Sequence, residues 1–119
     1  MRVTQAAYNS PQEFRTNSTN YVTIPGLTLA NFSATGPVLV TLEVPYGWSS
    51  GSECWLAIAV DGGVVRQGLL ATGGFCMSHI LDSPAHVLLE GQVRTNNPSG
   101  QAVVGVFGEA VAMLRVIES

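Results

Sequence analysis

The sequence predicts an all-β protein, an antiparallel β-sandwich, and three observations support this class. Short apolar runs follow one another from Tyr21 to Ile117, a cluster of Gly, Pro, Asn, Asp or Ser ends each run, and no helical stretch separates them. Many short strands with tight turns are typical of sandwiches. We expect nine strands, over residues 21–24, 27–32, 38–44, 53–60, 64–71, 75–81, 86–95, 102–107 and 110–117.

Residues 1–20 differ from the rest and are expected to form an N-terminal arm in front of a domain over residues 21–119. This segment is rich in Gln, Asn and Ser, and its apolar residues follow no sustained period. Such an arm either lies along the sandwich or reaches a neighbouring subunit, with Tyr8 and Phe14 as anchors, or it is a partly ordered terminus.

Proline and glycine punctuate the first strands of the sandwich. Pro25-Gly26 is expected to end the first strand, and a Ser-Ala-Thr-Gly turn ends the second. Residues 38–44 show the clearest period of two, which indicates a strand with one buried face. We expect Pro45 to close this strand and residues 46–52 to form a loop that is rich in Gly and Ser.

Asp61-Gly62-Gly63 predicts a β-hairpin between the strands on either side of it. Asp-Gly is among the strongest short-range hairpin signals, because both central residues of a type I′ turn need a positive φ. Residues 72–74 and 82–84 are the turns that follow.

The last strands alternate less regularly. One face of the strand over 86–95 carries Leu88 beside three polar side chains, so this face meets water or a polar interface. Residues 96–100 form an exposed loop, and Gly108-Glu109 separates the final two strands. The last strand ends close to the C-terminus, which is typical of a strand held inside a sheet.

The composition indicates a protein that associates with another surface. Of the 119 residues, 46% are hydrophobic and only 11% are charged, against about 25% charged in a typical soluble domain. Sandwich strands normally leave a charged outer face, whereas many outward positions here are Thr, Ser, Ala or Leu. We therefore expect a homo-oligomer.

The charge pattern argues against several partners. The five basic residues are all arginines, scattered singly in a chain of net charge −3 without lysine. Nucleic-acid binding needs clustered positive charge, and Schiff-base chemistry needs lysine, so we expect neither. The apolar runs are too short to span a membrane. The first twenty residues lack the apolar centre of a signal peptide, so we expect synthesis in the cytoplasm without one.

Four short segments resemble a known family when they are taken together. They are residues 21–27 (YVTIPGL), 36–41 (GPVLVT), 60–65 (VDGGVV) and 114–118 (LRVIE). They look like small trimeric jelly-roll domains, similar in shape to the tumour-necrosis-factor and C1q heads, that occur in bacteriophage tail-fibre, decoration and other virion proteins. The resemblance implies a jelly roll of eight to nine strands, a trimer, and a structural or receptor-binding role without catalytic residues.

The two cysteines, Cys54 and Cys76, are expected to be unbridged buried thiols. If residues 53–81 form a three-stranded meander, two strand spacings of about 9.6 Å separate them. Bridged Cα atoms lie within about 7 Å, so a disulfide would then be excluded. Folding across two sheets would bring the cysteines closer, which keeps the alternative open.

Groups that could carry chemistry do not assemble into a site, so we expect no enzyme, no metal and no cofactor. Cys76 and His79 point to opposite faces of one strand because their spacing is odd, which hinders a nucleophile–base pair. His79, His86 and Asp82 could meet across a turn, yet no HxH or CxxC spacing occurs. We interpret Asp82 as a residue that caps the turn through its own backbone.

Aromatic side chains give the best candidates for binding. Tyr46 and Trp48, on the predicted 46–52 loop, could stack on the apolar faces of sugar rings. Alternatively, Trp48 packs over the end of the sandwich or into a subunit contact, because tryptophan is enriched at interfaces. The interface candidates are Tyr8, Phe14, Trp55 and Leu88.

Two functions from different classes follow. The first is a non-enzymatic structural protein of a larger assembly, and the resemblance implies a trimeric bacteriophage virion component such as a capsid decoration protein, with a capsid or tail protein as partner. The alternative is a carbohydrate-binding or receptor-binding module that uses the loop with Tyr46 and Trp48.

Overall fold

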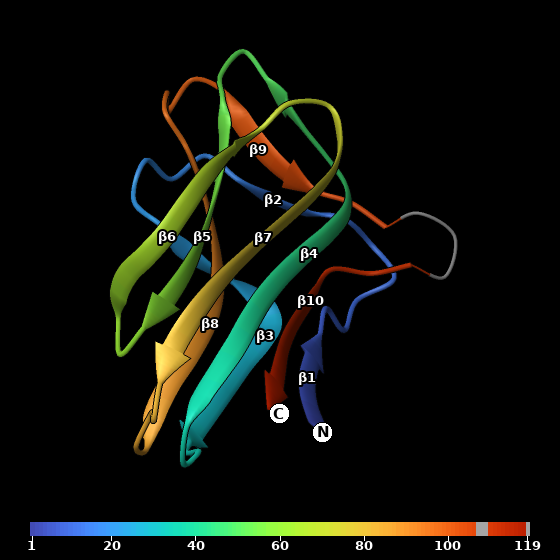
Figure 1. Cartoon of the computed structure of the whole chain (residues 1–119). Coiled ribbons are helices and arrows are strands. Elements are labelled where there is room, and N and C mark those ends of the chain that lie inside the picture. The colour runs from blue at the N-terminus through green and yellow to red at the C-terminus, as the bar shows by residue number, and fades with distance from the viewer. Residues whose placement is uncertain (107–109, 119) are drawn as a thin grey trace.

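The computed structural model describes residues 1–106 and 110–118, and these form two antiparallel sheets packed face to face (Figure 1). The strands within the described residues are β1 (Arg2–Ala7), β2 (Phe14–Thr16), β3 (Val22–Phe32), β4 (Pro37–Ser50), β5 (Cys54–Val60), β6 (Gly63–Leu70), β7 (Gly73–Asp82), β8 (Val87–Thr95), β9 (Gln101–Val104) and β10 (Met113–Glu118). The all-β class is confirmed.

Sheet A is organised around the long strand β4, and sheet B has the order β3-β8-β5-β6. The first half of β4 lies between β10 and β7, its second half pairs with β9, and β1 and β2 extend the sheet beyond β10 and β9. Sheet A therefore contains the order β1-β10-β4-β7. The chain passes repeatedly from one sheet to the other, which is the jelly-roll arrangement.

The core lies between the two sheets and follows the period of two. Val38, Val40, Leu42 and Val44 of β4 are at most 2% exposed, as the alternation over 38–44 predicts. Sheet B faces them with buried side chains that include Leu56, Ile58, Leu89 and Val93. The core is mainly aliphatic, with the aromatic rings of Tyr8 and Phe32 packed into it, so its stability comes from apolar burial.

The first twenty residues contribute two strands, β1 and β2, to sheet A, so this segment lies along the sandwich, which was one of the expected arrangements. β1 pairs with β10 over its whole length, and β2 pairs with β9. Tyr8 is only 5% exposed and belongs to the core, and its backbone N–H donates to the Ala112 carbonyl at 2.9 Å. Segment 1–20 is therefore anchored to its own chain.

Two prolines that were expected to end strands instead lie at irregularities within strands. Pro45 falls between Val44 and Gly47, where the register of β4 against β7 shifts and β4 takes β9 as a partner. The ladder is interrupted there, so the missing N–H of proline costs little. Residues 46–50 are consequently strand, and the prediction of a 46–52 loop is wrong over these residues. Pro25-Gly26 likewise lies within β3, where the register of β3 against β8 shifts between Thr23 and Thr28.

The Asp-Gly hairpin is confirmed, whereas the three-stranded meander considered for residues 53–81 does not form. Asp61 and Gly62 have φ values of 51° and 82°, as a type I′ turn requires, and they join β5 to β6. The next connection, however, carries the chain from sheet B to sheet A. Cys54 is buried in β5, Cys76 is exposed on β7, and both are free. The prediction that both thiols are buried is therefore wrong for Cys76.

The C-terminal region agrees with the prediction in part. β10 lies between β1 and β4, so the last strand is held inside a sheet. Strand β9 ends at Val104, short of the expected 107. Residue 107 and the Gly108-Glu109 turn lie outside the described residues.

Candidate functional site

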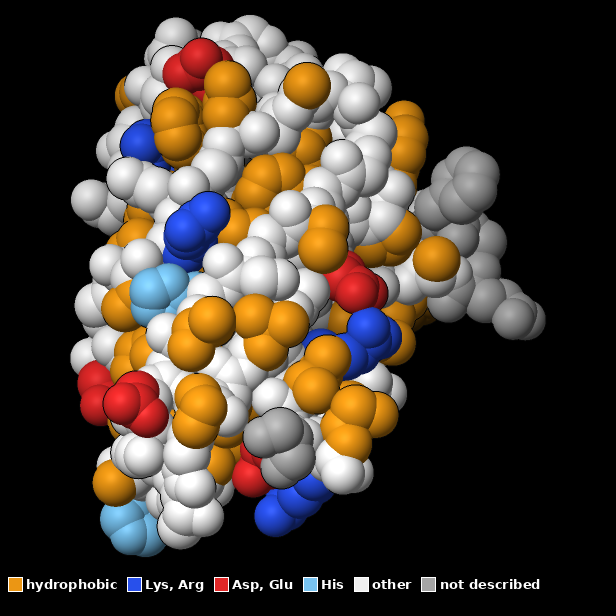
Figure 2. Space-filling view, viewed as in Figure 1, with side chains coloured by type: hydrophobic (Ala, Val, Ile, Leu, Met, Phe, Trp, Pro, Cys, Tyr) orange, Lys and Arg blue, Asp and Glu red, His pale blue; other side chains and the backbone are white. Residues whose placement is uncertain are grey.

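The outer face of sheet A includes a four-stranded part, β1-β10-β4-β7, on which side chains from distant segments line up. Figure 2 shows this face from the side on which β7 and β4 lie in Figure 1, and hydrophobic side chains are spread over it among polar ones. The pairing registers place the outward residues of β1, β10, β4 and β7 in rows across the strands. These rows differ in chemistry.

We define the apolar row as Val3, Ile117, Leu39 and Ile80, which are paired in that order from β1 to β7. Val3 is 46% exposed, Leu39 36% and Ile80 67%. Three members of the row, Leu39, Ile80 and Ile117, line a hollow of about 560 Å³ together with Met1, Pro37 and Val38. Four aligned apolar side chains on one sheet face are more than scattered surface hydrophobics, and such patches mark interaction sites.

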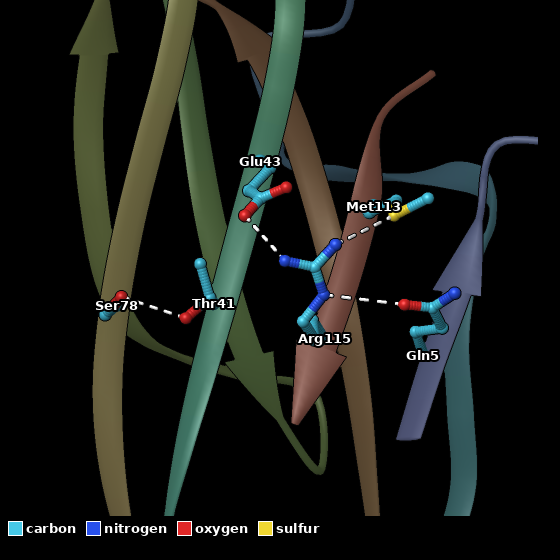
Figure 3. A network of polar contacts seen from close by, with 6 residues as sticks. All are labelled: Gln5, Thr41, Glu43, Ser78, Met113 and Arg115. Atoms are coloured by element: carbon cyan, nitrogen blue, oxygen red, sulfur yellow. Dashed lines mark hydrogen bonds and ion pairs between the residues drawn. The ribbon is translucent and has the colours of Figure 1, made fainter. Parts of the chain in front are cut away.

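The neighbouring polar row is Gln5, Arg115, Thr41 and Ser78. Figure 3 shows the hydrogen bonds and the ion pair that its members form with one another and with Glu43 and Met113. Arg115 pairs with Glu43 Oε1 at 3.0 Å and donates to Gln5 Oε1 at 3.4 Å. Thr41 and Ser78 share a hydrogen bond of 3.0 Å between their hydroxyls.

The interactions of the polar row leave the middle of this face without net charge. The positive guanidinium of Arg115 lies against the negative carboxylate of Glu43, and its second amino group contacts Met113 Sδ at 3.4 Å. Beyond this row a second hollow, of about 520 Å³, is lined by apolar residues that include Pro45, Phe75 and Val111 and by the paired Glu43 and Arg115. The face as a whole can therefore bind an uncharged, partly apolar surface.

Tyr46 and Trp48 lie on the same sheet but farther along β4, and on strand instead of loop. A Cβ added at Gly47 would lie 2.8 Å from Leu70 Cδ1, so Gly47 faces the core and its two neighbours face outward. The Arg15 guanidinium lies 5.1 Å from the centroid of the Trp48 ring. The Tyr46 ring lies over Gly105, where an added Cβ would be 2.7 Å from Tyr46 Cδ1.

The other interface candidates are dispersed. Tyr8 is buried in its own chain, with its hydroxyl donating to the Gln12 carbonyl, and Phe14 packs against the same core. This burial leaves little of Tyr8 for a contact with another subunit. Trp55 and Leu88 lie on the outer side of sheet B, because their neighbours Leu56 and Leu89 are fully buried.

The candidate chemical groups remain apart. Cys76 is exposed on the outer side of β7, and His79 lies three residues later on the opposite side of that strand. Burial raises the pKa of the Cys54 thiol to about 11, which keeps it protonated and poorly nucleophilic at neutral pH. Within residues 1–106 and 110–118, no group of three or more His, Cys, Asp or Glu side chains could hold a metal ion. The described residues contain no helix that is long and apolar enough to cross a membrane.

The apolar row was missed by the sequence reasoning because its four residues come from four separate segments. The alternation over 38–44 does point Leu39 outward, and that is the one local signal. Its neighbours in space, Val3, Ile80 and Ile117, follow only from the pairing of β1, β10 and β7 with one another and with β4.

Comparisons with known proteins show the fold. No protein-family model and no curated protein matches the chain. A carbohydrate-binding domain, CBM36-1 of a multidomain xylanase from the hindgut metagenome of Trinervitermes trinervoides, is similar in structure, with a TM-score of 0.53 and 13% identity over 99% of this chain and 98% of that one. The insecticidal delta-endotoxin Cry8Ea1 of Bacillus thuringiensis gives a TM-score of 0.52 and 13% identity over 88% of this chain. This chain spans only 19% of the toxin's length. At such identities the likeness establishes a shared β-sandwich fold and nothing finer.

Proposed function

We propose that this protein is a non-enzymatic assembly domain that associates with copies of itself through the outer face of sheet A. The observation that carries the proposal is the exposed apolar row from Val3 to Ile80. Burial of apolar area contributes about 25 cal/mol per Å². Burial of this row against a partner therefore stabilises the complex relative to the isolated chain.

A second copy is the occupant that fits this face best. The central Arg115–Glu43 pair neutralises its own charge, so the face offers no net charge to attract a strongly acidic or basic partner. Homo-oligomeric interfaces are depleted in charge at their centre and more apolar than the rest of the surface. The chain has only 11% charged residues, which also suits repeated contacts between copies.

The trimeric state and the place of the trimer in a larger structure rest on the resemblance described above. That resemblance implies a trimer with a structural or receptor-binding role. We accordingly propose a homotrimer that decorates or completes a larger shell, such as a bacteriophage capsid or tail.

Molar-mass measurement by light scattering on a sizing column tests self-association. The wild-type chain is expected to elute as a stable oligomer, with three times the chain mass, at micromolar concentration. Leu39→Glu and Ile80→Glu place a charge in the apolar row and should yield monomers whose circular dichroism is unchanged. Val64→Glu is a matched control, since Val64 is 41% exposed on β6 of the other sheet and should leave the mass unaltered. A monomeric wild-type chain at tens of micromolar would overturn the proposal.

Carbohydrate binding is a second candidate function, favoured by two observations. A carbohydrate-binding domain has a similar structure over almost the whole of both chains. Trp48 and Tyr46 also project from the same outer face of β4. A glycan array read with wild type and Trp48→Ala tests this function: saturable binding that the substitution removes supports it, and a blank array contradicts it.

A further inference from the structure

We propose that the outer face of sheet B holds a binding site for a carboxylate-bearing sugar, a hexuronate unit of an acidic polysaccharide, centred on Arg94. The site uses residues other than Tyr46 and Trp48, so it goes beyond the carbohydrate candidate above. It also lies on the sheet opposite the apolar row and is independent of self-association.

The Arg94 guanidinium lies between two aromatic rings. Arg94 on β8 is paired directly with Trp55 on β5, and its Cζ lies 5.4 Å from the centroid of the Trp55 ring. Tyr21, just before β3, brings its ring to 5.2 Å from the same atom. Such contacts attract the cation to the ring faces and restrict the orientation of its planar fork.

The charge of Arg94 has no carboxylate partner in the described part of the chain. Arg2, Arg15 and Arg115 each form an ion pair, with Glu118, Glu13 and Glu43 respectively. Arg94 instead donates a long hydrogen bond of 3.4 Å to the Thr95 carbonyl and lies beside the Tyr21 hydroxyl. A guanidinium has five N–H donors, so most of them remain available.

A fork held in this way suits a planar carboxylate. Arginine and a carboxylate form two parallel N–H···O bonds, which give both strength and orientation. The ordering of the side chain has already taken place, because Trp55 and Tyr21 hold the guanidinium before any ligand arrives. Preorganisation of this kind raises affinity by lowering the entropy lost on binding.

The groups around Arg94 match the rest of a sugar ring. Glu53 Oε1 accepts from Trp55 Nε1 at 3.3 Å and from Asn96 Nδ2 at 2.8 Å, so a carboxylate and an amide lie at the edge of the indole. Such groups accept from and donate to hydroxyls. Leu69, which is 48% exposed, is paired with Trp55 on the other side and offers an apolar surface to ring C–H groups.

A sugar fits this site better than an acidic peptide does. Glu53 accepts a hydrogen bond from the Trp55 indole, so its carboxylate repels a ligand with several negative charges more strongly than a ligand with a single carboxylate. A hexuronate carries one carboxylate per ring among uncharged hydroxyls, whereas an acidic peptide that binds arginine commonly brings several carboxylates together. In a trimer three such sites would share one polysaccharide, and their effective affinity would rise.

Calorimetric titration of the full chain with uronate oligomers tests the site. The probes are the trisaccharides of galacturonate, glucuronate and mannuronate, the methyl ester of the tightest binder, and a hexaglutamate peptide. We expect saturable binding of at least one trisaccharide and a loss of tenfold or more with its uncharged ester. Failure of all three trisaccharides, equal binding of the ester, or tighter binding of the peptide would overturn the proposal.

Variants then locate the binding on sheet B. Arg94→Gln should lower affinity at least tenfold, and Arg94→Lys should recover only part of it. Arg66→Gln is the matched control, because Arg66 lies exposed on β6 of the same sheet and forms no ion pair among the described residues. It should leave affinity within twofold, and a loss equal to that of Arg94→Gln would mean nonspecific attraction.

Two further measurements keep the outcome independent of folding and of the other proposals. In wild type, the indole N–H resonance of Trp55 should shift on titration while that of Trp48 stays in place. The monomeric Ile80→Glu variant and Trp48→Ala should both bind the trisaccharide with unchanged intrinsic affinity. A shift at Trp48 alone would move the binding to β4 and refute the Arg94 site.

Discussion

The Tyr21 hydroxyl donates a hydrogen bond of 2.8 Å to Gln67 Oε1 and so connects the two edges of sheet B across its outer face. Tyr21 precedes β3, Gln67 lies on β6, and strands β8 and β5 run between them. Gln92 and Ala57, in register with Gln67, are only 9% and 0% exposed although they point outward. The side chains above them therefore cover this face, and burial raises the pKa of the Tyr21 hydroxyl.

Substitutions at Tyr21 should separate the effect of the ring from that of the hydroxyl. Tyr21→Phe keeps the cover and loses one hydrogen bond, so the free energy of unfolding should fall by about 1 kcal/mol. Tyr21→Ala also uncovers Ala57 and Gln92 and should cost about 1–2 kcal/mol more. Urea unfolding followed by tryptophan fluorescence measures both changes. An equal decrease in the free energy of unfolding for the two variants would show that covering Ala57 and Gln92 with the ring does not stabilise the fold.

Gly47 should tolerate no larger residue, because it faces the core at the point where β4 changes partner. A Cβ there would lie 2.8 Å from Leu70 Cδ1 and 3.1 Å from the Val103 carbonyl oxygen. Gly47→Ala should therefore cost about 1–3 kcal/mol through overpacking. Gly63→Ala is the control, since its nearest atom would be the Val60 carbonyl oxygen at 3.6 Å, and it should stay within about 0.5 kcal/mol. Thermal unfolding of the pair gives the comparison.

Asp61 should be replaceable by Asn but not by Ala. It adopts a φ of 51°, and its Oδ1 accepts a hydrogen bond of 2.8 Å from the Leu88 N–H. Asparagine tolerates this φ and keeps the acceptor, so Asp61→Asn should stay near the wild-type stability. Alanine tolerates the positive φ poorly and lacks the acceptor, so Asp61→Ala should lower the free energy of unfolding by about 1–3 kcal/mol. Asp61→Gly relieves only the backbone, and chemical denaturation should place it between the other two.

The two thiols should differ sharply in reactivity. Cys76 is exposed and Cys54 is buried, with its pKa raised to about 11 by burial. A disulfide reagent such as Ellman's reagent should therefore titrate one thiol quickly in the folded chain and a second only in denaturant. Cys76→Ser should abolish the quick phase, whereas rapid modification of that variant would contradict the burial of Cys54.

The same thiol should make stability depend on alkaline pH. Cys54 titrates at about 11 in the folded chain, above its ordinary value of 9.0, so the unfolded thiol ionises first as pH rises. The contribution of the protonated thiol to the free energy of unfolding is complete below pH 9 and is lost between pH 9 and about 11. We expect a loss of about 1 kcal/mol between pH 9 and 10. Unfolding curves of wild type and Cys54→Ala, compared from pH 8 to 10.5, should show a difference that shrinks. A constant difference would count against this linkage.

Local signals in the sequence predicted the local features of the fold. The alternation over 38–44 and the Asp61-Gly62 turn each depend on a few neighbouring residues, and both are confirmed. The prolines were misread because a proline is harmful only where the ladder needs its N–H, and Pro45 lies where β4 changes partner. Residues 1–20 lacked a period because β1 and β2 are short edge strands whose structure depends on residues about a hundred positions away.

The candidate sites were harder to predict because each is assembled across strands. Tyr46 and Trp48 were sought on a loop, since nothing local shows that β9 pairs with that part of β4. Trp55 was predicted to be an interface residue, and its contact with Arg94 depends on the register between β5 and β8. The sequence shows which side chains are present, whereas the strand pairing decides which of them lie next to one another.

Strand β10 has a consequence for the order in which this fold can form. It lies between β1 and β4, so residues 2–7 gain their place in sheet A only after residues 113–118 have been synthesised. On the ribosome, β1 and one edge of β4 must wait with unpaired N–H and C=O groups while the rest of the chain emerges. Strand β10 therefore completes the face by which copies would recognise one another, and a nascent chain that still lacks β10 cannot present that face.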